Sequence, residues 1–113
     1  MTASQPSLGE VLDALRATLE QRKGADPSTS YVASLYAKGL DTVLKKIGEE
    51  AAETLVAAKN GSRPELVHEI ADLLFHVLVL MAREGIPMGD LAVELSGRMG
   101  RSGHEEKAAR SKQ

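Results

Sequence analysis

The hydrophobic positions of this chain recur at helical spacing from residue 8 onward. In the first segment, apolar residues return every three or four positions, at Leu8, Val11, Leu12, Leu15 and Leu19. Ser7 precedes this run and Glu10 follows three residues later, which is a capping-box signature. We therefore expect a helix from Leu8 to about Lys23, and a loop from Gly24 to Ser30, where Asp26-Pro27 marks a turn.

Two long helical patterns follow this loop. The first starts at Tyr31, is interrupted at Gly39 and continues to Asn60-Gly61, a typical helix end. The second starts after Ser62, with Pro64 in its first turn, and runs to Glu84. A shorter helix opens at residues 87–90 and fades near residue 97, and residues 100–113 form a polar, basic tail. No strand-like alternation appears, so the pattern predicts an all-α fold, an antiparallel bundle of four to five helices.

The predicted helix from Pro64 to Glu84 is apolar around most of its circumference. At about 100° per residue, its only polar stripe contains Glu65, Glu69, Asp72 and His76. A helix that is apolar on most sides must be covered on most sides, and four short helices of one chain barely suffice. We therefore expect the bundle to be completed by a homodimer.

Two acidic pairs on neighbouring predicted helices are the main chemical feature of the sequence. Glu50 and Glu53 are three positions apart, and after fifteen intervening residues Glu69 and Asp72 repeat the step. Three residues are just under one turn of about 3.6 residues, so each pair projects from one side of its helix. In an antiparallel arrangement the four carboxylates converge, and they repel one another unless a cation neutralises them. Oxygen ligands suit hard ions, so we expect bound Mg²⁺, with Mn²⁺ as the alternative.

An acidic pair at this spacing is more often a solvated helix face than a metal site, and two observations favour the metal. Glu69 and Asp72 interrupt an otherwise apolar helix, where unpaired ionised groups are costly. Lys46 is the only basic residue on the facing stripe. His76, four residues after Asp72, is by frequency a hydrogen-bonded helix histidine, and the functional alternative is a residue that orients a metal ligand. Glu65-x-x-His68 matches half of a di-iron motif that has no second half here.

Composition limits the classes of partner and compartment. The 113 residues, 42% of them apolar, predict one globular domain over residues 1–113. With 14 basic and 16 acidic residues, the net charge of −2 predicts neither a nucleic-acid nor a membrane partner. The apolar stretch from Leu73 to Ala82 is far shorter than the roughly 20 residues of a membrane span. The absence of cysteine excludes thiolate sites, and no signal-peptide pattern is visible, so we expect a cytoplasmic location.

The region from Ser30 to Ala82 resembles the phosphoribosyl-ATP pyrophosphohydrolases, the second enzymes of histidine biosynthesis. They belong to the all-α, MazG-type nucleotide pyrophosphatases, whose hallmark is Glu-x-x-Glu, a variable gap, and Glu-x-x-Asp. The four acidic residues described above fill these positions. The branch is selected by three short runs, namely Ser30-Tyr31, Lys45-Lys46-Ile47-Gly48-Glu49-Glu50 and Asp72-Leu73-Leu74-Phe75-His76. Residues 102–110 also resemble the family's carboxy-terminal segment, and Phe75 stands where tyrosine is more frequent.

The resemblance implies Mg²⁺-dependent hydrolysis of a small nucleotide, phosphoribosyl-ATP, to phosphoribosyl-AMP and pyrophosphate. It also implies a MazG-like bundle, and the chemistry of the residues themselves suggests a role for each site residue. Glu50, Glu53, Glu69 and Asp72 would hold the metal, and Glu50 would be catalytic together with Glu49 or Glu53, one of which accepts the proton of water. Phosphate charge would be neutralised by four basic residues, Lys38, Lys45, Lys46 and Arg98.

Two alternatives come from other functional classes. A housecleaning pyrophosphatase of free or damaged nucleoside triphosphates would share the metal site and differ around the base. A non-catalytic helical dimer would use the acidic face to bind a partner.

Overall fold

The structure, a computed structural model, describes residues 5–100 and is helical in every regular element of that range. The elements are α1 (Leu8–Gln21), a 3₁₀ turn (Arg22–Gly24), α2 (Tyr31–Lys38), α3 (Leu40–Asn60), α4 (Arg63–Glu84) and α5 (Met88–Ser96). No strand occurs between residues 5 and 100. The predicted all-α class is confirmed. Most of the predicted polar tail, from residue 101 on, lies outside the described residues.

The helix starts follow the capping chemistry of the sequence. The Ser7 hydroxyl oxygen accepts a hydrogen bond from the Glu10 N–H at 3.1 Å, as the capping box predicts. The Ser62 hydroxyl oxygen accepts one from the Glu65 N–H at 3.4 Å at the start of α4. At the other end of α1 the chain tightens into the 3₁₀ turn, so the regular helix ends at Gln21 rather than near Lys23.

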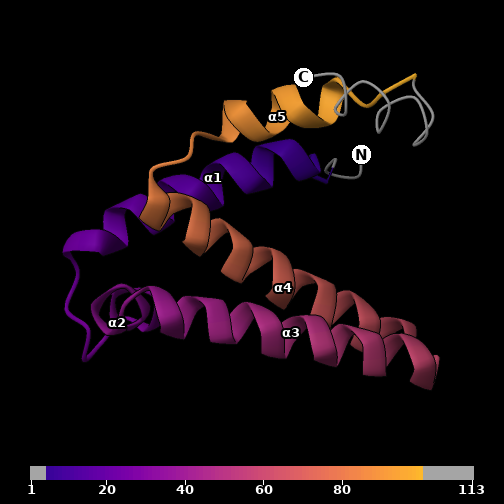
Figure 1. The fold of residues 1–113 in the computed structure, drawn as a ribbon, viewed down its shortest axis with the longest axis horizontal. Coiled ribbons are helices and arrows are strands. Elements are labelled where there is room, and N and C mark those ends of the chain that lie inside the picture. Colours follow the sequence, from indigo (N-terminus) through magenta and orange to yellow (C-terminus); the bar gives the residue numbers. More distant parts are fainter. Residues whose placement is uncertain (1–4, 101–113) are drawn as a thin grey trace, which may run out of the picture.

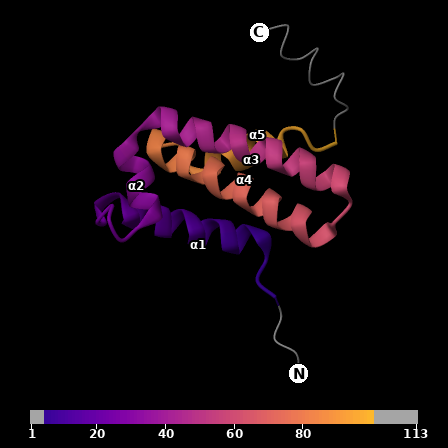
Figure 2. The same cartoon turned by 90° about the horizontal axis from the view of Figure 1, so that it is seen from below.

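Gly39 separates α2 from α3. Its φ of 96° lies in a region that side-chain-bearing residues rarely adopt, so the change of direction between the two helices depends on glycine. Beyond it, α3 and α4 form a long antiparallel hairpin around Gly61, and this pair makes the most extensive packing in the molecule (Figures 1 and 2). The hairpin brings the two acidic helices side by side.

The hydrophobic core lies where α1 and α2 meet the hairpin. Leu19 from α1, Val43 from α3 and Val79 from α4 are fully buried, and each contributes about 1.5–3 kcal/mol by burial. The Tyr36 hydroxyl donates a hydrogen bond to the Leu19 carbonyl at 3.0 Å and ties α2 to α1. The core thus anchors one end of the hairpin, and α5 lies along α1, with which it lines an apolar cavity.

The other part of the hairpin keeps apolar side chains exposed. On α4, Val67, Ile70 and Leu74 are 61%, 42% and 40% exposed, and on α3 Leu55 and Val56 are exposed as well. The helices of one chain therefore cover only one side of α4, whose circumference is apolar almost all round. No helix within residues 5–100 is both long and apolar enough to cross a membrane.

Candidate metal centre

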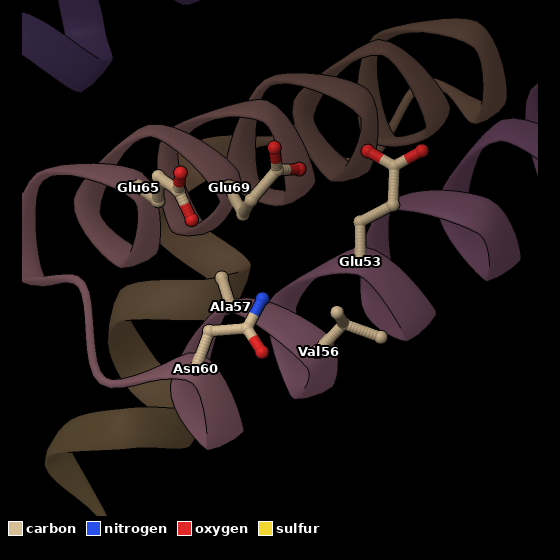
Figure 3. A pocket seen from close by; sticks show the side chains of 6 residues that line it. All are labelled: Glu53, Val56, Ala57, Asn60, Glu65 and Glu69. Carbon is tan, nitrogen blue, oxygen red and sulfur yellow. The ribbon is translucent and has the colours of Figure 1, made fainter.

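Carboxylates from α3 and α4 meet across the hairpin. Glu50, Glu53 and Glu69 each place one carboxylate oxygen within 4.8 Å of those of the other two. Figure 3 shows Glu53 projecting from α3 and Glu69 from α4 toward one pocket. The three-residue step within α3 and the antiparallel packing of α4 together produce this convergence, as the sequence pattern predicts.

Asp72 belongs to a second, overlapping group. Its carboxylate, a ring nitrogen of His68 and a carboxylate oxygen of Glu69 also lie within 4.8 Å of one another. The His68 Nε2 atom is 3.3 Å from Asp72 Oδ2. The acidic residues therefore form two triads joined at Glu69, whereas the sequence pattern suggested one group of four. His68 was not predicted as a site residue, and its four-residue spacing to Asp72 is the signal that could have identified it.

Glu50 is the most enclosed of these acids. Its side chain is nearly buried, since the residue is only 6% exposed, and its only ionic partner in the described chain is Lys46, whose Nζ lies 3.7 Å from Oε1. The second oxygen, Oε2, is buried and has no hydrogen-bond partner, and the same holds for Oε2 of Glu69. A buried ionised oxygen without a partner is energetically costly. Binding of a cation or a proton at either atom would remove that cost.

Electrostatics favour a proton or a cation at Glu69. Burial is the main cause that raises the pKa of its carboxyl group above the ordinary glutamate value, and the neighbouring carboxyl groups of Glu53 and Glu50 raise it further. The adjacent His68 acts in the opposite direction. A divalent cation would reverse this balance, because it favours the ionised form of every acid that it contacts.

A cavity of about 350 Å³ adjoins Glu53 and Glu69 of the first triad. It is lined by Glu53, Val56 and Ala57 of α3, by Asn60 at the end of that helix, and by Glu65 and Glu69 of α4 (Figure 3). Three of these six residues are acidic and none is basic. The cavity therefore suits cations and hydroxyl groups rather than bare phosphate.

His76 is a buried, doubly hydrogen-bonded residue next to this site. Its Nδ1 lies 2.7 Å from the Asp72 carbonyl oxygen, which can only accept, so Nδ1 carries the hydrogen. In the neutral ring Nε2 is then an acceptor, and it receives the hydroxyl hydrogen of Tyr31 at 2.8 Å. This arrangement joins the start of α2 to the part of α4 that carries Asp72. The Tyr31 contact spans 45 positions and was not predicted from the sequence.

The remaining predicted site residues lie around the acidic groups or apart from them. Glu49 is exposed on α3 and belongs to neither triad, and Lys45 is also exposed on that helix. Lys38 is the exposed last residue of α2. Arg98 follows α5 and pairs with Glu94 at 3.1 Å. Of the four predicted phosphate-binding cations, only Lys46 contacts a residue of the acidic triads.

Comparison with known proteins shows the family to which the chain is similar. Residues 12–98 match the family model described as phosphoribosyl-ATP pyrophosphohydrolase. A protein of Methylococcus capsulatus named phosphoribosyl-ATP pyrophosphatase is 57% identical over 101 residues, which cover 89% of this chain and 96% of the relative. Proteins of the same name from Rhizorhabdus wittichii and Geobacter sulfurreducens are 54% and 51% identical. These alignments cover 89% and 90% of this chain, and 95% and 94% of the relatives.

Both acidic pairs lie within the matched region, and the family model and the relatives agree over most of the chain. This protein therefore belongs to the phosphoribosyl-ATP pyrophosphohydrolase family.

Proposed function

We propose that this protein hydrolyses phosphoribosyl-ATP to phosphoribosyl-AMP and pyrophosphate, the second step of histidine biosynthesis, with a divalent metal held by its α3–α4 carboxylates. The observation that carries the proposal is the convergence of Glu50, Glu53 and Glu69 within a chain of this family. The names of the relatives supply the substrate, and the acidic triads supply a chemistry suited to a phosphoanhydride.

The residues present fit a hard divalent cation, Mg²⁺ or Mn²⁺. All three glutamates offer oxygen ligands, and the unpartnered Oε2 atoms of Glu50 and Glu69 are the donors that an ion would satisfy. Asp72 would join through the second triad, which shares Glu69. When bound, the ion would polarise the phosphoryl oxygens, make water more acidic and stabilise the leaving pyrophosphate.

Side chains of the protein would accept the proton of water and bind the phosphates. Glu53 is exposed yet lies in the first triad, so it is our preferred acceptor of the proton of water, and Glu49, outside both triads, is the second candidate. Lys46 neutralises part of the charge of Glu50 and lies at the edge of the site, where a phosphate would bind. Phosphate binding by Lys38, Lys45 and Arg98 remains a prediction from the sequence alone.

Substrate preference tests the proposal against its closest alternative. Pyrophosphate release should be fastest, in kcat/KM, with phosphoribosyl-ATP when ATP and dCTP are assayed beside it. A higher kcat/KM with a free triphosphate would instead make the protein a housecleaning pyrophosphatase.

Replacing Glu53 by Gln should lower kcat on the order of 100-fold or more, because the amide neither holds a metal as well nor accepts a proton. Glu53 is exposed, so the circular dichroism spectrum and thermal midpoint should stay near those of the wild type. Glu84→Gln is the matched control, since Glu84 is the exposed last residue of α4, pairs with its neighbour Arg83 and belongs to neither triad. Full activity of Glu53→Gln would favour a non-catalytic role for the acidic face.

Removing metal should expose the repulsion at Glu69. In EDTA, folding raises the pKa of the Glu69 carboxyl group. Between the pKa of the unfolded chain and that of the folded chain, the folded chain therefore binds more protons than the unfolded chain. The unfolding free energy should therefore fall relative to Glu69→Gln as the pH rises above about 4.3, the ordinary glutamate pKa. Urea unfolding of both proteins between roughly pH 4 and pH 8 measures the difference. A difference that is independent of pH would contradict the assigned repulsion.

We also propose that the chain forms a homodimer that completes a MazG-like bundle. Val67, Ile70 and Leu74 follow one another at steps of three and four on α4, so their exposed side chains form a single stripe. Leu55 and Val56 extend the exposed apolar surface onto α3. Contiguous apolar surface of this kind is typical of protein interfaces. The cytoplasmic location predicted from the sequence remains a prediction.

A charge in this stripe should break the dimer. Ile70→Glu places a carboxylate where a second chain would bury it, so we expect monomers in analytical ultracentrifugation at micromolar concentration. Leu8→Glu, at an exposed position of α1, is the control and should leave the wild-type dimer intact. A wild type that sediments as a monomer, or an Ile70→Glu variant that sediments as a dimer, would contradict the proposed interface.

A further inference from the structure

A second cavity of about 350 Å³ lies at the start of α2, apart from the acidic pocket. Its walls include Arg22 from the 3₁₀ turn, Thr29 and Tyr31 around the start of α2, and Phe75 from α4. None of the residues that line it is acidic. Its electrostatic character is therefore opposite to that of the pocket lined by Glu53, Glu65 and Glu69.

Arg22 brings an uncompensated positive charge to this cavity. No ion pair formed within residues 5–100 includes Arg22, whereas its neighbour Lys23 pairs with Glu20 at 2.9 Å. A guanidinium group presents several N–H donors in a planar fork that matches the oxygens of a phosphate. A free arginine in a cavity without acids is a group to which a phosphate can bind.

Backbone donors reinforce this preference. At the start of α2, the Ser30 side chain accepts from the Ala33 N–H, and the Ser30 carbonyl accepts from the Ser34 N–H. The N–H groups of Tyr31 and Val32, both of which line the cavity, have no acceptor within the described chain. These N–H groups lie at the positive end of the α2 dipole and add to the attraction that Arg22 exerts on an anion.

Tyr31 links this cavity to the metal centre. Its ring forms part of the cavity wall, and its hydroxyl donates to His76, which in turn donates to the carbonyl of Asp72. Phe75 contributes an apolar face to the same cavity. The centroid of its ring lies 5.4 Å from that of the His76 ring. A substrate whose reacting phosphates lie at the acidic triads can therefore extend past Tyr31 toward Arg22.

Phosphoribosyl-ATP has a second anionic end. It differs from ATP by a 5-phosphoribosyl group on the adenine ring, so one phosphate lies far from the triphosphate that is cleaved. We propose that the Arg22 cavity binds this 5-phosphate and makes the enzyme select phosphoribosyl-ATP over ATP. The inference rests on the proposed function, which places the triphosphate at the acidic triads. It assigns Arg22 as the residue that recognises the phosphate at the other end of the substrate.

The test compares two substrates and two proteins. The substrates are phosphoribosyl-ATP and 1-ribosyl-ATP, which lacks only the remote phosphate, and the proteins are the wild type and Arg22→Gln. With phosphoribosyl-ATP, the substitution should raise KM about 10- to 100-fold, the usual worth of a charged hydrogen-bonded contact, with kcat changed less than about threefold. With 1-ribosyl-ATP, the same substitution should change kcat/KM less than about threefold, because the contact is already absent.

Two results would overturn the proposal. An equal loss of kcat/KM with both substrates would place Arg22 on the triphosphate or in a structural role, and an unchanged KM for phosphoribosyl-ATP would remove it from binding. Arg83→Gln is the matched control, since Arg83 is an exposed arginine near the end of α4 that pairs with Glu84, and it should leave both substrates unaffected.

Failure of the metal centre would be seen separately. In that case the wild-type protein would release pyrophosphate without a divalent ion. The Arg22 test, by contrast, depends only on the ratio of the kcat/KM values for the two substrates. Binding of Mn²⁺, measured by calorimetry, should be the same for Arg22→Gln and the wild type, because Arg22 belongs to neither acidic triad.

Discussion

Mutual repulsion among carboxylates is the constraint on which this structure depends. Glu50, Glu53 and Glu69 place oxygens within 4.8 Å of one another, and the Oε2 atoms of Glu50 and Glu69 are buried without a hydrogen-bond partner. One lysine, Lys46, at 3.7 Å from Glu50, offsets only part of this charge. The hairpin can hold the acids together because its far end is fixed by a core of buried aliphatic side chains. In the proposed function a divalent cation would supply the missing positive charge, and the same charge would assist hydrolysis of the phosphoanhydride.

The two sides of the site have different electrostatic character. The α3–α4 pocket is acidic and attracts metal and hydroxyl groups, while the cavity beside α2 carries Arg22 and free N–H groups and attracts phosphate. Tyr31 of α2 is joined to His76 of α4 by one hydrogen bond, and His76 is held in turn by the Asp72 carbonyl of its own helix. A nucleotide with phosphates at both ends matches this arrangement better than ATP does. Under these two proposals, catalysis and selection of the substrate would take place in two separate cavities.

Much of the fold follows from local chemistry that the sequence displays. Ser7 and Ser62 start their helices as expected, and Gly39 and Gly61 end or redirect helices at positive φ. The convergence of the first three glutamates follows from a three-residue step and an antiparallel hairpin. The division into two triads does not, because the pairing of Asp72 with His68 depends on side-chain rotamers. Nor does the Tyr31–His76 contact, because it depends on the angle at which α2 leaves α3.

Thermal unfolding of the wild-type protein with and without Mg²⁺ tests the central claim most directly. An ion that binds the folded carboxylates and not the unfolded chain raises stability with the logarithm of its concentration. We expect the midpoint temperature in excess Mg²⁺ to lie several degrees above that in EDTA, and to rise further as Mg²⁺ is increased. An equal midpoint in both conditions, at an ionic strength held constant with NaCl, would mean that no metal relieves the repulsion among these acids.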